Sequence, residues 1–373
     1  MAGRRSGAAA RWAAVLGVVA VLVALPSLVA ALPASDAGTS APDLRRAAVA
    51  SADVAFTGYA QSAGGLSLPV GDQLTAVANL LSDRTTMRAW YRGPADWRVD
   101  VVSPTGETGV HADTGGTWTW NYEAATATRT APSPLALPTA SDLLPSALGR
   151  RLLSEAADDE LSRLGAERVA GRDALGLRLV PADQASSVAR VDVWVDADSG
   201  VPLRVQVFGK DAAGAGAEAA LDTAFLDLEL TTPSAGVTAF DVPPGAHVRT
   251  GEDAGLVQAA SRAGRDGDRI VLPAGLTGLA RRTFDGAPRG VGVYGRGITL
   301  LAVSAVPRRV ASGLHDALVT APGAVVDDLG VRISAGPLGL MLVDGPEGRM
   351  LLAGTVSLDA LAAAATELTG GQS

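Results

Sequence analysis

The sequence predicts an α+β protein in which antiparallel strands outnumber helices, with a smaller α+β domain at the C-terminal end. Apolar and polar residues alternate in several short segments, such as Trp97 to Val101, which is typical of half-buried strands. The connections between these segments are too short for the crossover helices that parallel strands need. Helical spacing of apolar residues occurs in only a few places, near the start, in the middle and at the end of the chain.

Residues 1–34 predict an export signal or an N-terminal membrane anchor. Three arginines lie within the first eleven residues, before an uncharged stretch from Trp12 to Leu32. Small residues at Val29-Ala30-Ala31 suit signal peptidase. If it is not cleaved, the same stretch has about the 20 residues that a membrane-spanning helix needs. Either alternative places the rest of the chain outside the cytoplasmic membrane.

Composition excludes several classes of function. A net charge of -8 and a pI near 5.0 disfavour a nucleic-acid partner, because phosphate binding needs a basic surface. The absence of cysteine excludes disulfides, thiolate zinc sites and a cysteine nucleophile. No G-x-S-x-G, H-E-x-x-H or P-loop pattern occurs, so we expect a non-enzymatic protein without catalytic residues, cofactor or resident metal.

Strands and one interrupting helix are expected in the first domain, over residues 43–246. A helix followed by a strand is expected from Asp43 to Ala63, and further strands from Thr85 to Arg129 with a turn at Gly115-Gly116. Leucines at helical spacing predict a helix, which could be broken, between Ser141 and Leu164. Later strands are predicted at Gly176–Val180, Arg190–Val195, Val201–Phe208 and Thr223–Leu230, and Asp196 to Gly200 closes a hairpin.

Residues 247–268 are rich in glycine and charge and are predicted to be a linker. The smaller domain, 269–370, is expected to contain strands within Gly290–Val303, Ala324–Ile333 and Gly339–Thr355. A final helix capped by Ser357 should end at Gly370.

Two short motifs have a plain structural reading. Gly290 to Gly295 matches G-x-G-x-x-G, but a strand-like segment follows where a dinucleotide site needs a helix. Asp158-Asp159-Glu160 is interpreted as a solvated helix face in preference to a metal cluster.

Tyr91 to Trp97 combines a basic residue, a proline and an aromatic strand, and Asp113, Trp118 and Trp120 follow it. By these residues and their spacing, the first domain resembles the LolA-like lipoprotein carrier superfamily, most closely the two-domain RseB/MucB type that regulates sigma-E. The hairpin around Asp196 to Gly200 and the closing segment Phe240–Gly245 are also similar. Leu272–Leu276, Gly295–Val303 and Leu352–Leu368 look like the smaller domain that RseB has and the simple carriers lack.

The resemblance implies a curved antiparallel half-barrel whose concave face, partly covered by helices, binds an acyl chain, a lipid or a lipoprotein. By position, Arg92 would fasten the helical lid. An RseB-like protein would regulate a membrane partner such as an anti-sigma factor; the alternative is a LolA-like carrier that delivers acylated cargo. A purely structural surface domain without a ligand is the third hypothesis.

Large flat side chains on the predicted strands are the candidates for the cavity wall. An acyl chain needs an apolar surface and little polar complementarity. Ordinary core packing explains such a stripe at least as well. The candidates are Trp90, Trp97, Val99, Val101, Trp118, Trp120 and Tyr122.

Overall fold

The computed structural model describes residues 15, 34–65, 84–103, 106–133, 138–210, 218–251, 272–284, 290–345 and 348–370. The expected signal or anchor at residues 1–34 lies almost wholly outside them, as does the expected linker beyond residue 251. Within the described residues no helix combines the length and the apolar content needed to cross a membrane.

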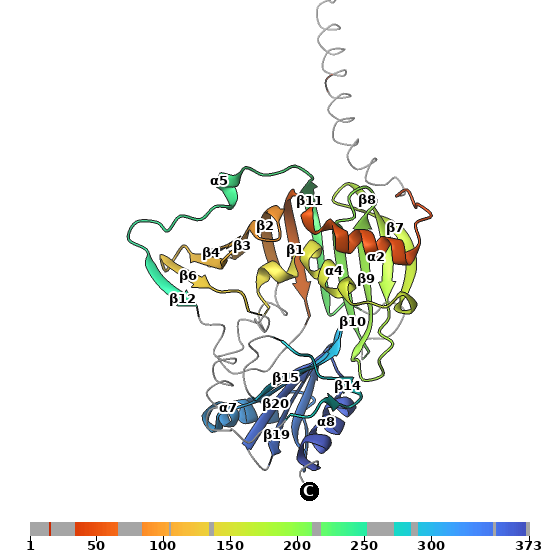
Figure 1. Ribbon diagram of the computed structural model, residues 1–373, viewed down its shortest axis with the longest axis vertical. Helices are drawn as coiled ribbons and strands as arrows, with labels where there is room; N and C mark the ends of the chain where they lie inside the picture. The colour runs from red at the N-terminus through yellow and green to blue at the C-terminus, as the bar shows by residue number, and fades with distance from the viewer. Residues whose placement is uncertain are drawn as a thin grey trace, which may run out of the picture.

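A twelve-stranded curved sheet dominates the structure (Figure 1), which is mostly β. Its order is β12-β6-β5-β4-β3-β2-β1-β11-β10-β9-β8-β7. The strands are β1 (Phe56–Gly64), β2 (Arg84–Gly93), β3 (Asp96–Ser103), β4 (Gly106–Asp113), β5 (Gly116–Asn121), β6 (Thr126–Thr130), β7 (Leu161–Val169), β8 (Arg172–Leu179), β9 (Val188–Asp196), β10 (Pro202–Gly209), β11 (Leu221–Glu229) and β12 (His247–Gly251).

One pair of strands in this sheet departs from the expected antiparallel pattern. β12 pairs parallel with β6, from His247 beside Thr126 to Gly251 beside Thr130. The chain reaches this edge after a long excursion from β11, which removes the constraint that short hairpin connections place on strand direction. Residues 247–251 were expected in the linker and instead complete the sheet.

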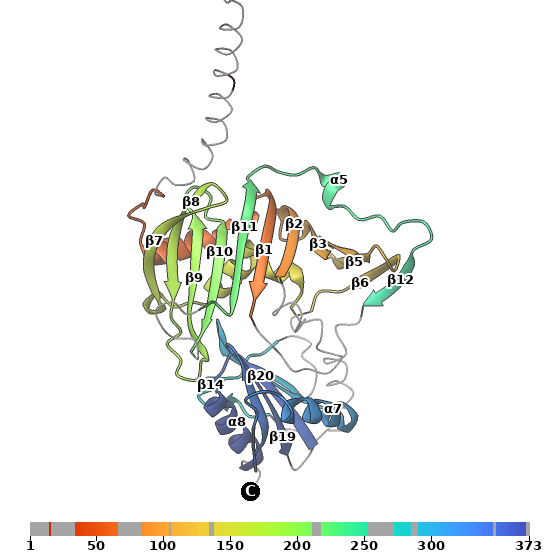
Figure 2. The ribbon, with the colours of Figure 1, turned by 180° about the vertical axis from the view of Figure 1, so that it is seen from behind.

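Two helices cover one face of the sheet, which we call the inner face. α2 (Ala41–Ala50) begins at Ser40, whose hydroxyl accepts from the amide of Asp43, and α4 (Pro145–Ser154) has proline in its first turn. Leu44 and Leu153 are buried with the apolar side chains of the strands. Figure 1 shows both helices in front of the sheet, and Figure 2 shows the sheet from its other side.

The helix predicted between Ser141 and Leu164 is shorter than expected. A 3-10 turn, η2 (Ala140–Leu143), precedes α4, and α4 ends at Ser154. A second 3-10 turn, η3 (Asp158–Glu160), leads directly into β7. Leu161 and Leu164 therefore belong to a strand, because pairing with β8 outweighs their helical spacing.

A second, six-stranded antiparallel sheet follows, in the order β15-β16-β20-β19-β18-β17. Each of the three strand segments expected here is a hairpin. Gly297 adopts positive φ in the turn of the first hairpin, and Gly336 adopts positive φ in the turn that joins the second hairpin to the third. A two-stranded ribbon of β13 (Gly275–Leu276) and β14 (Leu279–Ala280) precedes it. The strands are β15 (Val291–Arg296), β16 (Thr299–Ala305), β17 (Val325–Asp327), β18 (Gly330–Ala335), β19 (Leu338–Gly345) and β20 (Gly348–Gly354).

Helices cover both faces of the second sheet. α8 (Leu358–Gly370) packs with Met341 and Val343, whereas α7 (Arg308–Val319) packs with Leu340 and Leu342. Alternate residues of β19 point to opposite faces, so the two helices lie on opposite sides. α8 begins as predicted, with the Ser357 hydroxyl accepting from the amide of Ala360 at 3.2 Å; α7 was not predicted.

Two carboxylates in the segment between α4 and β7 join the first sheet to the second. Arg296 donates to both oxygens of Glu160 at 2.9 Å, and Arg282 donates to both oxygens of Glu155 at 2.7 and 2.9 Å. The amide of Gly297 also donates to Glu155 at 2.7 Å. Glu160 was expected on a solvated helix face, but its side chain is only 6% exposed.

We expect Glu160→Gln to lower the free energy of unfolding by about 1–2 kcal/mol at pH 7. The variant loses the charged hydrogen bonds to Arg296, but the loss is limited because Arg296 is half-exposed and solvent screens its charge. Burial alone raises the pKa of Glu160, but hydrogen bonds from Arg296, Ala182 and Ala157 outweigh it and hold the pKa below its usual value. The ionised carboxylate therefore stabilises the fold at neutral pH, and this stabilisation disappears as the pH falls through the lowered pKa. Urea denaturation at pH 7 and about pH 3 measures this stabilisation. If the difference in unfolding free energy between wild type and Glu160→Gln were the same at both pH values, the stabilising role of the ionised Glu160 would be contradicted. Asp158→Asn, at an exposed position, is the control.

Candidate functional site

The inner face carries a compact aromatic group where β1, β2 and β11 adjoin. Phe56 stacks on Tyr91 with ring centroids 5.0 Å apart and meets Phe225 edge-on at 5.5 Å. The Tyr91 hydroxyl donates to the carbonyl of Ala52 at 2.7 Å. These rings form the part of the inner face that is solid core.

β3 extends this apolar surface toward the open end of the sheet. Tyr91 pairs with Trp97 and Ala89 with Val99, so alternate residues of β3 join the inner face. Val99 is buried, whereas Trp97 and Val101 are half-buried and pack against the core only in part. An apolar surface that stays partly accessible therefore borders the helix-covered core.

Arg150 of α4 introduces a charge beside this surface. Its guanidinium carbon lies 5.3 Å from the centre of the Tyr91 ring. The Nη1 atom is buried and has no hydrogen-bond partner among the described residues. Burial lowers the pKa of Arg150, because desolvation disfavours the cation. A buried donor without an acceptor is costly, so an anionic group of a ligand could compensate this cation.

Farther out, the inner face of β4 to β6 becomes polar. Val99 pairs with Val110, Val110 with Thr119, and Thr119 with Thr128. The threonines of this face are half-buried. They are Thr108, Thr117, Thr119, Thr126, Thr128 and Thr130.

The seven predicted wall residues do not form one wall. Trp97, Val99 and Val101 lie on the inner face, but register places Trp90 opposite Arg98, Arg98 opposite His111, and His111 opposite Trp118 on the other face, which we call the outer face. Trp120 and Tyr122 share the outer face with Trp118 because they follow it at intervals of two.

The chain itself covers the outer face. Residues 231–246, which we call the strap, run from β11 through the short helix α5 (Ala235–Thr238) to β12. Phe240 of the strap packs against His111 and Trp118, with ring centroids 5.0 and 5.5 Å apart, and lies 6.3 Å from Trp120. The outer aromatic residues are thus partly a second core, although Tyr122 remains 44% exposed.

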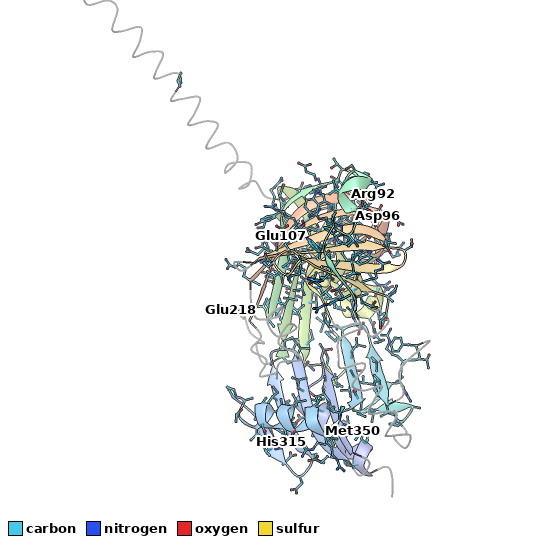
Figure 3. The ribbon with its side chains drawn as sticks, turned by 90° about the vertical axis from the view of Figure 1, so that its left-hand side faces the viewer. Arg92, Asp96, Glu107, Glu218, His315 and Met350 are labelled. Atoms are coloured by element: carbon cyan, nitrogen blue, oxygen red, sulfur yellow. The ribbon has the colours of Figure 1, made fainter. Side chains whose placement is uncertain are left out.

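Arg92 fastens the strap rather than α2 or α4. Its Nε donates to Asp96 at 2.7 Å, and its Nη1 donates to the carbonyl of Pro233 in the strap. Asp96 in turn accepts from the hydroxyl of Thr238 at 2.5 Å. Figure 3 shows Arg92 and Asp96 together next to α5. The expected fastening role therefore applies to a different segment.

The part of the chain that contains α4 and β7 to β10 is similar to a known family. Residues 130–220 match the family model of the MucB/RseB N-terminal domain. This part of the chain is MucB/RseB-like. The resemblance predicted from the sequence is confirmed, and the match includes the hairpin around Asp196 to Gly200. No curated protein matches the chain.

Solved structures of low identity are also similar to the chain. MucB in complex with MucA(peri) is 18% identical, with a TM-score of 0.47 over 87% of this chain and 97% of that one. The MucA/MucB complex of Pseudomonas aeruginosa is 17% identical, with a TM-score of 0.48 over 87% and 96%. A LolA superfamily protein from Nitrosomonas europaea is 11% identical, with a TM-score of 0.26 over 55% and 99%.

Sequence reasoning missed Arg150 and the pair Glu160–Arg296. Arg150 follows a helical stripe and precedes the exposed Arg151, so nothing in the local pattern distinguishes the two arginines. Among the described residues no group of three or more histidines or carboxylates could hold a metal ion.

We expect the strap to make stability depend on pH through His111. Its Nδ1 donates to the carbonyl of Thr238 at 3.0 Å, and burial lowers its pKa, aided by Arg98 and opposed by Thr238 and Asp100. The unfolded chain therefore takes up the proton first as the pH falls, and the folded state loses stability below about pH 6.5.

Thermal unfolding at pH 7.5 and 5.5 measures this dependence. His111→Gln, which keeps a donor near Thr238, should reduce the fall in Tm by about 2–4 °C, the shift that roughly 1 kcal/mol produces in a domain of this size. His315→Gln on α7 is the control. An equal fall in wild type and His111→Gln would refute the role of His111.

Proposed function

We propose that this chain is an exported, non-enzymatic RseB-like binding protein that holds an acyl chain of a lipid or lipoprotein and regulates a membrane partner. The observation that carries the proposal is the half-buried apolar surface at Trp97 and Val101, beside the helix-covered core. The MucB/RseB-like match of residues 130–220 supports the same reading. We also propose the division into a first domain over 43–246, extended by β12 to Gly251, and a smaller domain over 269–370.

Acyl chains suit this surface for a simple physical reason. Each methylene removed from water contributes about 0.8 kcal/mol, so Trp97, Val99 and Val101 need only offer contact area. The threonine hydroxyls farther out can meet ester or amide groups near the head of an acylated ligand. A surface that is apolar at one end and polar at the other fits an amphiphile.

Arg150 favours an anionic group on that amphiphile. The cation lies over Tyr91, and its Nη1 has no hydrogen-bond partner among the described residues. A phosphate or carboxylate at Arg150 would gain a charge-assisted hydrogen bond, which is roughly twice as strong as a neutral one. We therefore favour acidic lipids over neutral ones.

Trp97→Ala should weaken acyl binding about tenfold, equivalent to about 1.4 kcal/mol of lost contact. Trp90→Ala is a matched control, because Trp90 is also half-buried and lies on the neighbouring strand, but on the outer face, where the guanidinium carbon of Arg98 is 5.1 Å from its ring centre. Native mass spectrometry of the purified full chain with palmitate and a diacylated lipopeptide measures occupancy. Equal losses in both variants, or no uptake by the wild type, would overturn the inner-face site.

The regulator and the carrier differ in what they bind tightly. A regulator should co-elute in size-exclusion chromatography with the extracytoplasmic region of an anti-sigma factor encoded beside it, with a Kd of about 1 μM or lower. Transfer of labelled lipopeptide between donor and acceptor vesicles, without a stable complex, would favour the LolA-like carrier instead.

A further inference from the structure

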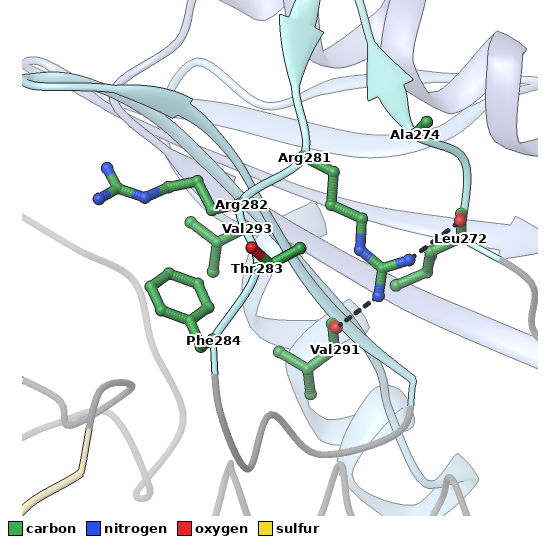
Figure 4. Close-up of a pocket in the computed structure, with 8 residues that line it drawn as sticks. All are labelled: Leu272, Ala274, Arg281, Arg282, Thr283, Phe284, Val291 and Val293. Atoms are coloured by element: carbon green, nitrogen blue, oxygen red, sulfur yellow. Dashed lines mark hydrogen bonds between the residues drawn. The ribbon is translucent and has the colours of Figure 1, made fainter.

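A cavity lies away from the inner-face surface, in the part of the chain that follows the first sheet. We call it the second cavity to keep it distinct from the proposed acyl site. It has a volume of about 440 Å3, within the range of small-ligand sites. The segment after β14 runs beside β15, with the amide of Arg282 donating to the carbonyl of Val293 at 2.7 Å. Leu272, Phe284 and Val291 supply further apolar lining (Figure 4).

Two arginines line this cavity, and they differ in how their charge is compensated. Arg282 makes its paired hydrogen bonds with Glu155 across the junction between the sheets. Arg281 donates to the main-chain carbonyls of Leu272 at 3.1 Å and Val291 at 3.5 Å. Figure 4 shows its guanidinium between these two carbonyls. It forms no ion pair with a carboxylate of the described residues. The two carbonyls therefore fix the position of the Arg281 guanidinium without neutralising its charge.

We propose that this cavity binds a small amphiphile with a single anionic head, a carboxylate or a phosphate monoester, and a short apolar chain. The head would accept hydrogen bonds from the Arg281 fork, whose planar geometry suits such oxyanions. The chain would pack against Leu272, Val291 and Val293. Arg282 is already paired with Glu155, whose carboxylate places a negative charge close to the cavity. A second anionic group on the ligand would therefore be disfavoured.

This inference does not depend on the proposed acyl site of the first sheet. None of Trp97, Val99 or Val101 lines the second cavity. The two sites can therefore be tested separately in the same protein.

Isothermal titration calorimetry of the purified full chain, with ligands kept below micelle formation, tests the proposal. Decanoate, decyl phosphate, neutral decanol and the dicarboxylate sebacate are compared. We expect decanoate, decyl phosphate or both to bind, at least tenfold more tightly than decanol or sebacate. The carboxylate and phosphate arms identify which head group the cavity takes.

Arg281→Met should weaken the preferred anion about tenfold, and Arg281→Lys, which keeps the charge without the fork, should weaken it less. Arg349→Met is the matched control on the second sheet, where Arg349 already pairs with Asp344 at 2.6 Å. Decanol binding as tightly as the anions, no binding of either anion, or unchanged affinity in Arg281→Met would overturn the proposal. Loss of binding in Trp97→Ala but not in Arg281→Met would assign the ligand to the first sheet and overturn it as well.

Discussion

The packing of Phe240 against His111 and Trp118 determines which face of β3 to β5 remains available. A strand with aromatic side chains on one face must bury that face against something. Here the strap supplies the cover, so the aromatic face becomes an outer core held by the chain itself. The opposite face, with Trp97, Val101 and the threonines, is left for other contacts.

This arrangement explains why the strands could be predicted from the sequence but the face of the sheet on which each aromatic residue lies could not. The alternation in β3 and β5 predicted the strands, and the hairpin at Asp196 to Gly200 was expected from its turn residues. Periodicity assigns Trp97 and Trp118 each to a face of its own strand, but it cannot say whether the two side chains lie on the same face of the sheet, because β4 lies between their strands. That depends on the register of β3, β4 and β5, which is a property of pairing between strands.

Long-range contacts also account for the other differences. Leu161 and Leu164 continue a leucine spacing typical of helices, yet they pair with β8. Glu160 looks like part of an acidic surface run, but its buried side chain pairs with the half-exposed Arg296, far along the chain. In both cases the deciding partner lies outside the local sequence pattern. α7 was missed for a different reason, because it begins without a side-chain cap at Pro307, so the usual N-terminal signal is absent.

α4 connects these separate features physically. Arg45 of α2 donates to the carbonyls of Leu153 and Ser154 at 3.0 Å, where α4 ends, which is a favourable place for a cation. The next residue, Glu155, holds Arg282 and the amide of Gly297. The same helix carries Arg150 over the inner face. One ten-residue helix and the residue that follows it therefore contact both the inner face and the second sheet.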